Sequence, residues 1–378
     1  MSTLIQQTTD KLRQRITCGH VGHAGQLPSE HMIAREFGVS RCVVRHAFGA
    51  LERDGLLLRL PGVGRVAAKA ALPRPLASDL ILMIGSPPNH EANLRGYLNA
   101  IDSAAIAALG QQGEGVLAMD LRAITPERIE RLIADPPKGV VVGPQIERHP
   151  DCMALVHRLA DAGAAVVVVV VARDGETWRR YDRVVDDQEV GARELTRHLL
   201  ALGRTRIALM VLAAEPQAWW QARQRGYRAA MTEAGLSTLP PIPSQSVVER
   251  SGSLDPENLA NRTRASAGWL AMTFSAAGSE ENAPDALIAV TDGDVFPLCE
   301  AARLLGRDLI IAGYDNYWSD AWERTCSPHR PVATVDKDNP GMGRLLVRLL
   351  SERLADPTLP PRVQVHPPQL VITTYHNL

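Results

Sequence analysis

The sequence predicts an α/β protein with a winged helix-turn-helix at its amino terminus and doubly wound parallel sheets in the rest of the chain. Two observations predict this fold class. Residues 27–57 contain two short amphipathic helical patterns separated by a Gly-Val-Ser turn. From residue 80 onward, continuous apolar strand patterns alternate with helical patterns, which is typical of right-handed βαβ units with helices on both faces of a sheet.

The helix-turn-helix pattern has start and stop signals. Ser29 follows a proline and is a candidate N-cap for the first helix, and Gly38 can end that helix in the left-handed conformation. Ser40 is then placed to cap the second helix. These positions predict a tight turn between two helices, the arrangement by which many DNA-binding proteins present the second helix to the major groove.

The second helix of this motif has two different faces. Arg41, Cys42 and Arg45 lie on one face, with the two arginines one turn apart. The opposite face is apolar at helical spacing and is expected to pack into a core through Val44, Ala47, Phe48 and Leu51. A helix with a packed back and two arginines in front can enter the DNA major groove. The alternative is an ordinary helical hairpin whose arginines are merely solvated.

A β-hairpin is expected directly after the second helix, which Gly55 ends. Residues 56–60 and 65–67 are two short strand patterns on either side of a turn at 61–64. Such a hairpin is the wing of a winged helix-turn-helix. Arg65, near its tip, is placed to reach phosphates or a minor groove.

Charge and composition narrow the class of protein. Residues 1–70 hold ten Lys and Arg against five Asp and Glu, whereas the other residues hold 31 against 37, so a formal net charge of −1 hides a basic head on an acidic body. A basic head favours nucleic acid as a partner. The length of 378 residues allows two or three compact units.

The cysteines and the apolar segments argue against export, a membrane and a metal. The five cysteines show no paired spacing, which favours reduced cytosolic thiols, and they stand at 18, 42, 152, 299 and 326. The amino terminus has no signal segment, and the longest apolar run, 164–172, is too short to span a bilayer. We therefore expect a cytoplasmic protein with no membrane partner, no cofactor and no metal site.

Residues 4–67 resemble the winged helix-turn-helix of the GntR regulator family, whose Leu-Pro-Ser-Glu and Phe-Gly-Val-Ser-Arg motifs stand here at 27–30 and 37–41. This chain has Cys42 and Val43 where the family usually has small hydroxyl residues, so the arginines must carry more of the contact. The expected DNA-binding residues are Arg35, Ser40, Arg41, Cys42, Arg45, Gly64 and Arg65, of which Gly64 shapes the wing.

The larger part of the chain alternates between strand and helix. Strands are expected at 80–85, 115–121, 139–143, 165–171, 207–212, 286–291 and 309–313. Helices are expected at about 93–109 and at 126–134, 153–162, 191–202, 217–234 and 295–305. In such sheets ligands bind beyond the carboxyl ends of the strands.

Three pairs of segments carry a second resemblance, namely 186–191 with 198–208, 223–227 with 233–236, and 289–292 with 313–315. Through them, residues 80–375 resemble the effector domain of the lactose-repressor family, which is similar to periplasmic sugar-binding proteins. The resemblance implies two α/β lobes joined by three crossing strands, with the ligand in the cleft. A GntR-type head on this body is similar to the arrangement of arabinose-responsive repressors. The expected limits are 1–70 for the DNA-binding domain, 71–79 for a linker and 80–378 for an effector-binding and dimerisation domain.

The same resemblance implies an effector site. Arg223 stands at the cleft arginine and Asp315 at the cleft aspartate, for which the alternative is a surface ion pair. Asp292 stands at an acidic position, but Thr291 replaces the asparagine that the family has before it. His90 follows the first strand and can face the ligand or lie in a solvated loop.

Sugar sites also use aromatic rings to cover an apolar sugar face. The candidates are Trp219, Trp220 and Trp318, for which the alternative is core packing. The expected effector-binding set is Arg223, Asp292, Asp315, Trp220, Trp318 and His90.

These patterns predict a DNA-binding transcriptional regulator, a repressor, that binds a palindromic double-stranded operator as a homodimer and responds to a small molecule, a sugar. The alternative is a winged-helix protein with an enzymatic or purely solute-binding C-terminal domain. A pyridoxal-phosphate enzyme would need a Schiff-base lysine, and the lysines at 11, 69, 138 and 337 show no such context. We therefore expect no catalytic residues.

One apolar stripe has two possible roles. At helical spacing it comprises Met342, Leu345, Leu346, Leu349, Leu350 and Leu354. It is expected either to take part in self-association or to be buried against its own lobe.

Overall fold

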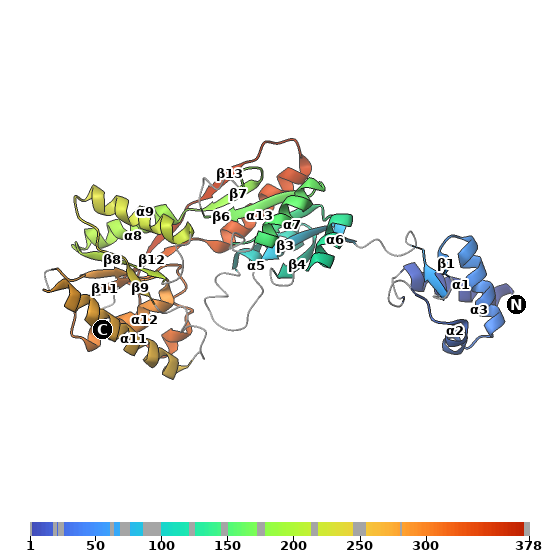
Figure 1. Ribbon diagram of the computed structural model, residues 1–378, viewed down its shortest axis with the longest axis horizontal. Helices are drawn as coiled ribbons and strands as arrows, with labels where there is room; N and C mark the ends of the chain where they lie inside the picture. Colours follow the sequence, from blue (N-terminus) through green and yellow to red (C-terminus); the bar gives the residue numbers. More distant parts are fainter. Residues whose placement is uncertain are drawn as a thin grey trace. The chain divides into compact units, whose positions relative to one another are not determined.

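The computed structural model describes residues 2–17, 21, 26–60, 64–68, 76–85, 100–120, 125–144, 150–171, 178–212, 218–244, 255–279 and 282–373. The chain divides into two compact units, Met1–Ser78 and Asp79–Leu378, which are described separately (Figure 1).

The first unit is a helical domain with a small hairpin. Its described elements are α1 (Ser2–Thr17), α2 (Glu30–Phe37), α3 (Arg41–Arg53), β1 (Leu57–Leu60) and β2 (Gly64–Ala67), the two strands being antiparallel. The predicted apolar face of α3 is fully buried, and it packs with Leu12 and Ile16 of α1, which sequence patterns did not single out. The predicted winged helix-turn-helix is confirmed.

The turn between α2 and α3 has the predicted caps. The Ser29 hydroxyl accepts a hydrogen bond from Met32 N, and the Ser40 hydroxyl accepts one from Val43 N, each at 3.3 Å. Gly38 ends α2 at a φ of 67°, a left-handed conformation that favours glycine. Because each signal acts over three or four residues, it could be read from the sequence.

The first lobe of the second unit is a parallel sheet of six strands. In spatial order they are β13 (Val363–His366), β7 (Asp182–Asp186), β6 (Ala165–Val170), β5 (Gly139–Val142), β3 (Leu80–Gly85) and β4 (Gly115–Asp120). Helices α6 (Pro126–Ala134) and α7 (Pro150–Asp161) cover one face, and α5 (Ala100–Gln111) and α13 (Asn339–Ala355) cover the other. Successive residues of the strands therefore enter two cores, which explains why the strands read as continuous apolar runs.

The second lobe is built in the same way. Its parallel strands, in spatial order, are β11 (Ile310–Ala312), β10 (Ala286–Ile288), β8 (Ile207–Leu212) and β9 (Ile242–Ser244). Helices α8 (Gln188–Ala201) and α9 (Ala218–Glu233) pack on one face, and α11 (Pro256–Ala277) and α12 (Asp292–Leu304) on the other. An antiparallel pair, β12 (Ala333–Asp336) and β14 (Gln369–Ile372), continues from β11, since Val332 N donates to Ile311 O. Short 3-10 helices lie at Leu76–Asp79 (η2) and Trp322–Thr325 (η6).

The chain passes between the lobes three times. The first crossing links β7 to α8, the second links β12 to α13, and the third links β13 to β14. The two-lobed, doubly wound class predicted from the sequence is confirmed. The predicted helices and strands are found with shifts of a few residues at their ends, except that residues 93–99 lie outside the described part of the chain.

The predicted apolar stripe lies on α13 and packs against the first lobe. Met342, Leu346, Leu349 and Leu350 are buried, and Leu345 and Leu354 pack partly buried against the same core of the first lobe. Of the two predicted roles, burial against its own lobe is the one that the structure shows. This stripe is therefore not a free surface for self-association.

Candidate functional site

The front of α3 is exposed in the first unit. Arg41, Cys42 and Arg45 lie in solvent on α3, and Arg35 is exposed in the last turn of α2. The capping residue Ser40 is exposed as well. These five side chains are therefore accessible to a partner, as expected of residues that would contact DNA.

Arg65 of β2 is held against the helices. Its Nε donates to Glu52 at 2.6 Å and its Nη1 to Glu30 at 3.1 Å, while its guanidinium lies 4.6 Å from the centre of the Phe48 ring. Only 18% of its side chain is exposed. The network joins the strand to both helices of the motif, so in the free protein Arg65 positions the wing.

Glu30, the last residue of the Leu-Pro-Ser-Glu motif, binds two of the predicted DNA contacts. Arg45 donates to Glu30 Oε2 at 3.1 Å, although the Arg45 side chain is 63% exposed. Burial raises the pKa of Glu30, but the hydrogen bonds from Arg45 and Arg65 outweigh that effect and hold the pKa below its usual range.

Gly64 begins β2 at a φ of 103°, and residues 61–63 of the predicted wing turn lie outside the described part of the chain.

Five buried polar side chains form a closed ring in the second unit. Gln188 Nε2 donates to Asp186 at 2.6 Å, and Arg223 Nε donates to Gln188 Oε1 at 2.7 Å. Arg223 Nη2 lies 3.4 Å from Asp315 Oδ1. Lys337 Nζ closes the ring, 3.3 Å from Asp315 Oδ1 and 3.5 Å from Asp186 Oδ2. We call these five residues the polar ring.

The fold places the polar ring at the carboxyl ends of strands. Asp186 is the last residue of β7, Asp315 follows β11, and Lys337 follows β12. Gln188 begins α8 and Arg223 lies in α9. Ligands of parallel α/β sheets bind at this end of the strands. The ring also opposes two carboxylates with two cations, which offsets the cost of burying charge.

Aromatic rings surround the Arg223 guanidinium. Its carbon lies 3.4 Å from the centre of the Tyr314 ring and 4.8 Å from that of Trp219, and its Nη1 donates to Val290 O at 2.6 Å. The Tyr314 hydroxyl donates to Gln188 O at 3.2 Å, and burial raises the pKa of this phenol. Arg223 is therefore held by two aromatic rings and by hydrogen bonds from its nitrogens.

Asp292, at the start of α12, is completely buried beside the ring. Its Oδ2 accepts hydrogen bonds from the backbone N–H of Tyr317 at 2.7 Å and of Trp318 at 3.1 Å, and its Oδ1 accepts one from the Thr334 hydroxyl at 2.7 Å. Burial nonetheless raises the pKa of Asp292 to about 8. Gly313 leaves room for the Asp292 carboxyl group, because a Cβ at position 313 would lie 1.9 Å from Asp292 Oδ1.

The structure brings together some of the predicted effector residues and not others. The side chains of Arg223 and Asp315 are 5% and 6% exposed, so their pair is not the surface ion pair that was the alternative. Asp315 has a φ of 91°, a strained conformation for a residue other than glycine and one that clusters at functional sites. The Asp292 carboxylate already accepts hydrogen bonds from the segment after β11 and from β12, and the Thr291 hydroxyl contacts the Tyr317 hydroxyl at 2.8 Å.

Of the three candidate tryptophans, one contacts the polar ring and two do not. Trp219, not Trp220, lies against Arg223. Trp220 Nε1 is buried with no hydrogen-bond partner among the described residues. Trp318 packs partly buried on the cluster that contains Phe296. His90 lies outside the described residues.

Sequence reasoning missed three members of the polar ring as site residues. Asp186 and Gln188 belong to one of the segments that carried the resemblance, so a polar pair directly after a strand was the available signal. Lys337 was considered only as a Schiff-base lysine. Its position two residues after an apolar strand pattern could have suggested a site at the strand end.

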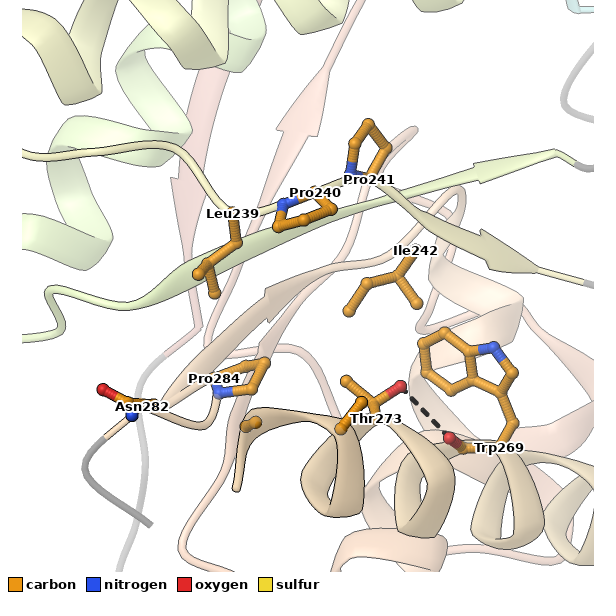
Figure 2. A pocket seen from close by; sticks show the side chains of 10 residues that line it. Leu239, Pro240, Pro241, Ile242, Trp269, Thr273, Asn282 and Pro284 are labelled. Carbon is orange, nitrogen blue, oxygen red and sulfur yellow. Dashed lines mark hydrogen bonds between the residues drawn. The ribbon is translucent and has the colours of Figure 1, made fainter. Parts of the chain in front are cut away.

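A separate apolar cavity of about 320 Å³ lies on the second lobe (Figure 2). It is lined by residues 239–242, by α11, and by Asn282 and Pro284, with no charged side chain and no member of the polar ring. Within it the Thr273 hydroxyl is turned to Trp269 O at 3.1 Å. The lining offers few polar groups to orient a hydroxyl-rich ligand.

The described residues offer neither a metal site nor a membrane-spanning helix. They contain no group of three or more His, Cys, Asp or Glu arranged to hold a metal ion. None of the described helices combines the length and apolar character needed to span a membrane.

Comparison with protein families matches both units. Residues 4–66 match the bacterial regulatory proteins of the gntR family. Residues 107–262 match the periplasmic binding proteins and sugar binding domain of the LacI family, and residues 196–373 match the periplasmic binding protein-like domain.

Among similar proteins are two regulators. The transcriptional regulator DegA of Bacillus subtilis (strain 168) is 29% identical over 182 residues, 47% of this chain and 47% of that protein. The arabinose metabolism transcriptional repressor of Geobacillus stearothermophilus is 26% identical over 205 residues, 53% of this chain and 54% of that protein. The chain thus spans about half the length of these relatives.

Solved structures share the fold. A complex of the transcriptional regulator CelR with cellobiose has a TM-score of 0.56 at 18% identity, over 91% of this chain and 98% of that one. A LacI family regulator from Enterococcus faecium with bound ribose has a TM-score of 0.55 at 18% identity, over 77% of this chain and 96% of that one. At these identities the likeness concerns the fold alone.

Proposed function

We propose, for a chain that joins a gntR-family helix-turn-helix domain to a periplasmic-binding-like domain of the LacI family, that the protein is a transcriptional repressor controlled by a small molecule. The observation that carries this proposal is the pairing, in one chain, of an exposed recognition helix with a buried polar ring at the carboxyl ends of strands. The first suits a DNA groove, and the second suits a small polar ligand.

In the DNA-binding half, Arg41 and Arg45 contact base edges and Arg35 positions the domain on phosphates. Arg65 reaches phosphates only by leaving Glu30 and Glu52, and in the free protein it holds the wing. A guanidinium fork matches the O6 and N7 acceptors of guanine. Arg45 can exchange its exposed pair with Glu30 for such a contact, because exposed ion pairs are weak. One winged helix covers one half-site, so the proposal includes a homodimer on a palindromic operator.

In the effector half, a sugar binds beside Arg223 and Asp315. Paired donors and acceptors on rigid side chains suit the vicinal hydroxyls of a sugar, and Trp219 offers an apolar face beside them. The similar repressor named for arabinose metabolism and the fold relatives with cellobiose and ribose support this choice of ligand class.

The rest of the proposal follows from the same two halves. The ring neutralises its own charges and leaves no obvious nucleophile or general base, which favours binding over catalysis. A regulator of transcription acts where the DNA is, so we place it in the cytoplasm.

The DNA-binding half can be tested with one substitution and a matched control. An operator would first be selected from random duplexes with the full chain, and its affinity measured by fluorescence anisotropy. Arg45→Ala is expected to weaken binding by roughly ten-fold or more, because one good guanine contact is worth about 1–3 kcal/mol. Arg53→Ala, in the last turn of the same helix, is expected to change it by less than about three-fold. Equal affinities of the Arg45 variant and the wild type would refute the assigned recognition helix.

A further inference from the structure

The contacts within the polar ring differ in length. The two hydrogen bonds of Gln188 are 2.6 and 2.7 Å long. The two cation contacts of Asp315 are 3.3 and 3.4 Å long. Charge-assisted hydrogen bonds are usually about 2.7–2.9 Å long. Asp315 is therefore the carboxylate at which a ligand hydroxyl, which forms hydrogen bonds of about 2.7–2.8 Å, can improve on the contacts already present.

Lys337 is the ring member that contacts carboxylates of both lobes. Asp186 ends β7 of the first sheet, whereas Asp315 follows β11 of the second. Lys337 itself lies on the second crossing, where Asp338 N donates to Asp336 Oδ1 at 2.7 Å and fixes the turn.

That crossing is tied to others. Asp338, at a φ of 44°, caps α13 by accepting from Gly341 N at 2.9 Å, and α13 packs on the first sheet. Its second carboxylate oxygen lies 3.1 Å from His366 Nε2 at the start of the third crossing. Lys337 therefore contacts Asp186 at the start of the first crossing and is followed on the second crossing by Asp338, whose side chain contacts His366 at the start of the third.

We propose that Lys337 is the positioning residue that couples occupation of the effector site to the lobe crossings. A sugar hydroxyl donating to Asp315 competes with the ammonium, which then pairs with Asp186. The state in which Lys337 pairs with both Asp186 and Asp315 differs in energy from the state in which it pairs with Asp186 alone. Effector binding therefore favours one arrangement of the crossings over another. A ligand can shift an equilibrium only through such a difference between states. This inference rests on the proposed function and adds the residue that transmits its signal.

The substitution that tests the coupling is Lys337→Met, which removes the charge and keeps the length of the side chain. Lys337→Arg restores a cation, and Arg344→Met removes an exposed cation near the same crossing as a matched control. Arabinose, ribose and cellobiose serve as probes. For each protein, sugar binding would be measured by calorimetry and operator binding by anisotropy with and without the sugar.

The expected pattern separates coupling from binding. The wild type and Arg344→Met should show the same change of operator affinity on sugar binding, within the usual range of about 5–150-fold. Lys337→Met should still bind the sugar, and more tightly than wild type because no ammonium competes for Asp315, while its operator response falls below about two-fold. Lys337→Arg should recover a response.

Other outcomes contradict either the inference or the proposed function. A wild-type chain that binds none of the three sugars, or whose operator affinity does not change with them, overturns the proposed function and this inference with it. A wild type that responds together with a Lys337→Met variant that responds equally overturns the role of Lys337 alone. Loss of sugar binding in a folded Lys337→Met protein makes Lys337 a ligand contact and also overturns the coupling role. If Lys337→Met does not fold, Lys337→Gln takes its place under the same criteria.

Discussion

Arg45 and Arg223 are the same residue in opposite settings. Arg45 stands on the exposed front of α3 with 63% of its side chain in solvent and one carboxylate partner. Arg223 has 5% of its side chain exposed and gives hydrogen bonds or ion pairs to Gln188, Val290 and Asp315. The exposed arginine can leave its partner at little cost, whereas the buried one cannot, because its removal would leave charged and polar groups buried without it.

This difference has a functional reading. A DNA-contacting side chain must change partners when the operator arrives, so a weak exposed pair suits it. A ligand-site arginine must already be in place when the ligand arrives, because preorganisation reduces the ordering cost of binding. The two halves of the proposed regulator thus use one chemical group for adaptable contact in one case and for rigid positioning in the other.

The largest predicted effect is that of Arg223→Ala. It leaves Asp315 with Lys337 alone and removes the donor to Gln188, so the free energy of unfolding should fall by about 3–5 kcal/mol. The matched control is Arg225→Ala on the same helix, whose pair with Glu189 is half exposed and should contribute less than about 1 kcal/mol. Urea unfolding followed by circular dichroism measures both. Similar small losses in the two variants would mean that the polar ring does not stabilise the domain.

A second prediction concerns pH. The pKa of Asp292 is about 8 in the folded protein, above its ordinary value of 3.8, so the folded state binds the extra proton between these values. The stability gained from this proton is complete at low pH and is lost as the pH rises toward the folded pKa, by at most about 1.4 kcal/mol per pH unit.

The substitution that isolates this effect is Asp292→Asn, which cannot titrate. Urea unfolding of both proteins would be measured at pH ~5, ~6 and ~7. As the pH rises, the free energy of unfolding of the variant should increase relative to that of the wild type. Parallel curves for the two proteins would show that Asp292 does not take up a proton on folding.

The smallest predicted effect on stability is that of Arg45→Ala. Its pair with Glu30 is largely exposed, so the free energy of unfolding should change by less than about 1 kcal/mol even though operator binding falls. Thermal unfolding of the full chain provides the measurement. A loss as large as that of Arg223→Ala would place Arg45 in the structural framework of the head and would remove the contrast between the two arginines.

Residue patterns predicted most of the individual elements. The helix-turn-helix was readable because Ser29, Gly38 and Ser40 act on neighbours three or four residues away. Strands such as β3, β5 and β6 were readable because a parallel strand buried on two faces reads as a continuous apolar run. Strands β7, β9 and β13 were not predicted, because they are short or contain polar residues. Helix α11 escaped prediction, since its buried residues are few and its pattern is not strongly amphipathic.

The candidate site was predictable only in part. Arg223 and Asp315 were found through resemblance, but no residue pattern indicated that they contact residues 186, 188 and 337. The members of the polar ring are up to 151 positions apart, between Asp186 and Lys337. Such contacts depend on which strand ends become neighbours when the sheets form.

Residue order alone is enough to predict the local structures and the character of their surfaces. The recognition helix is basic and the strands are apolar on both faces, because these features depend on short-range geometry and on the hydrophobic effect. The three-dimensional fold was needed to show that the stripe through Met342 and Leu346 is buried in its own lobe and that Lys337 closes a ring with Asp186 and Asp315. The physical reason is that a side chain's partners in a folded core are set by the strand order and by the three crossings, which bring together residues whose sequence neighbourhoods contain no record of each other.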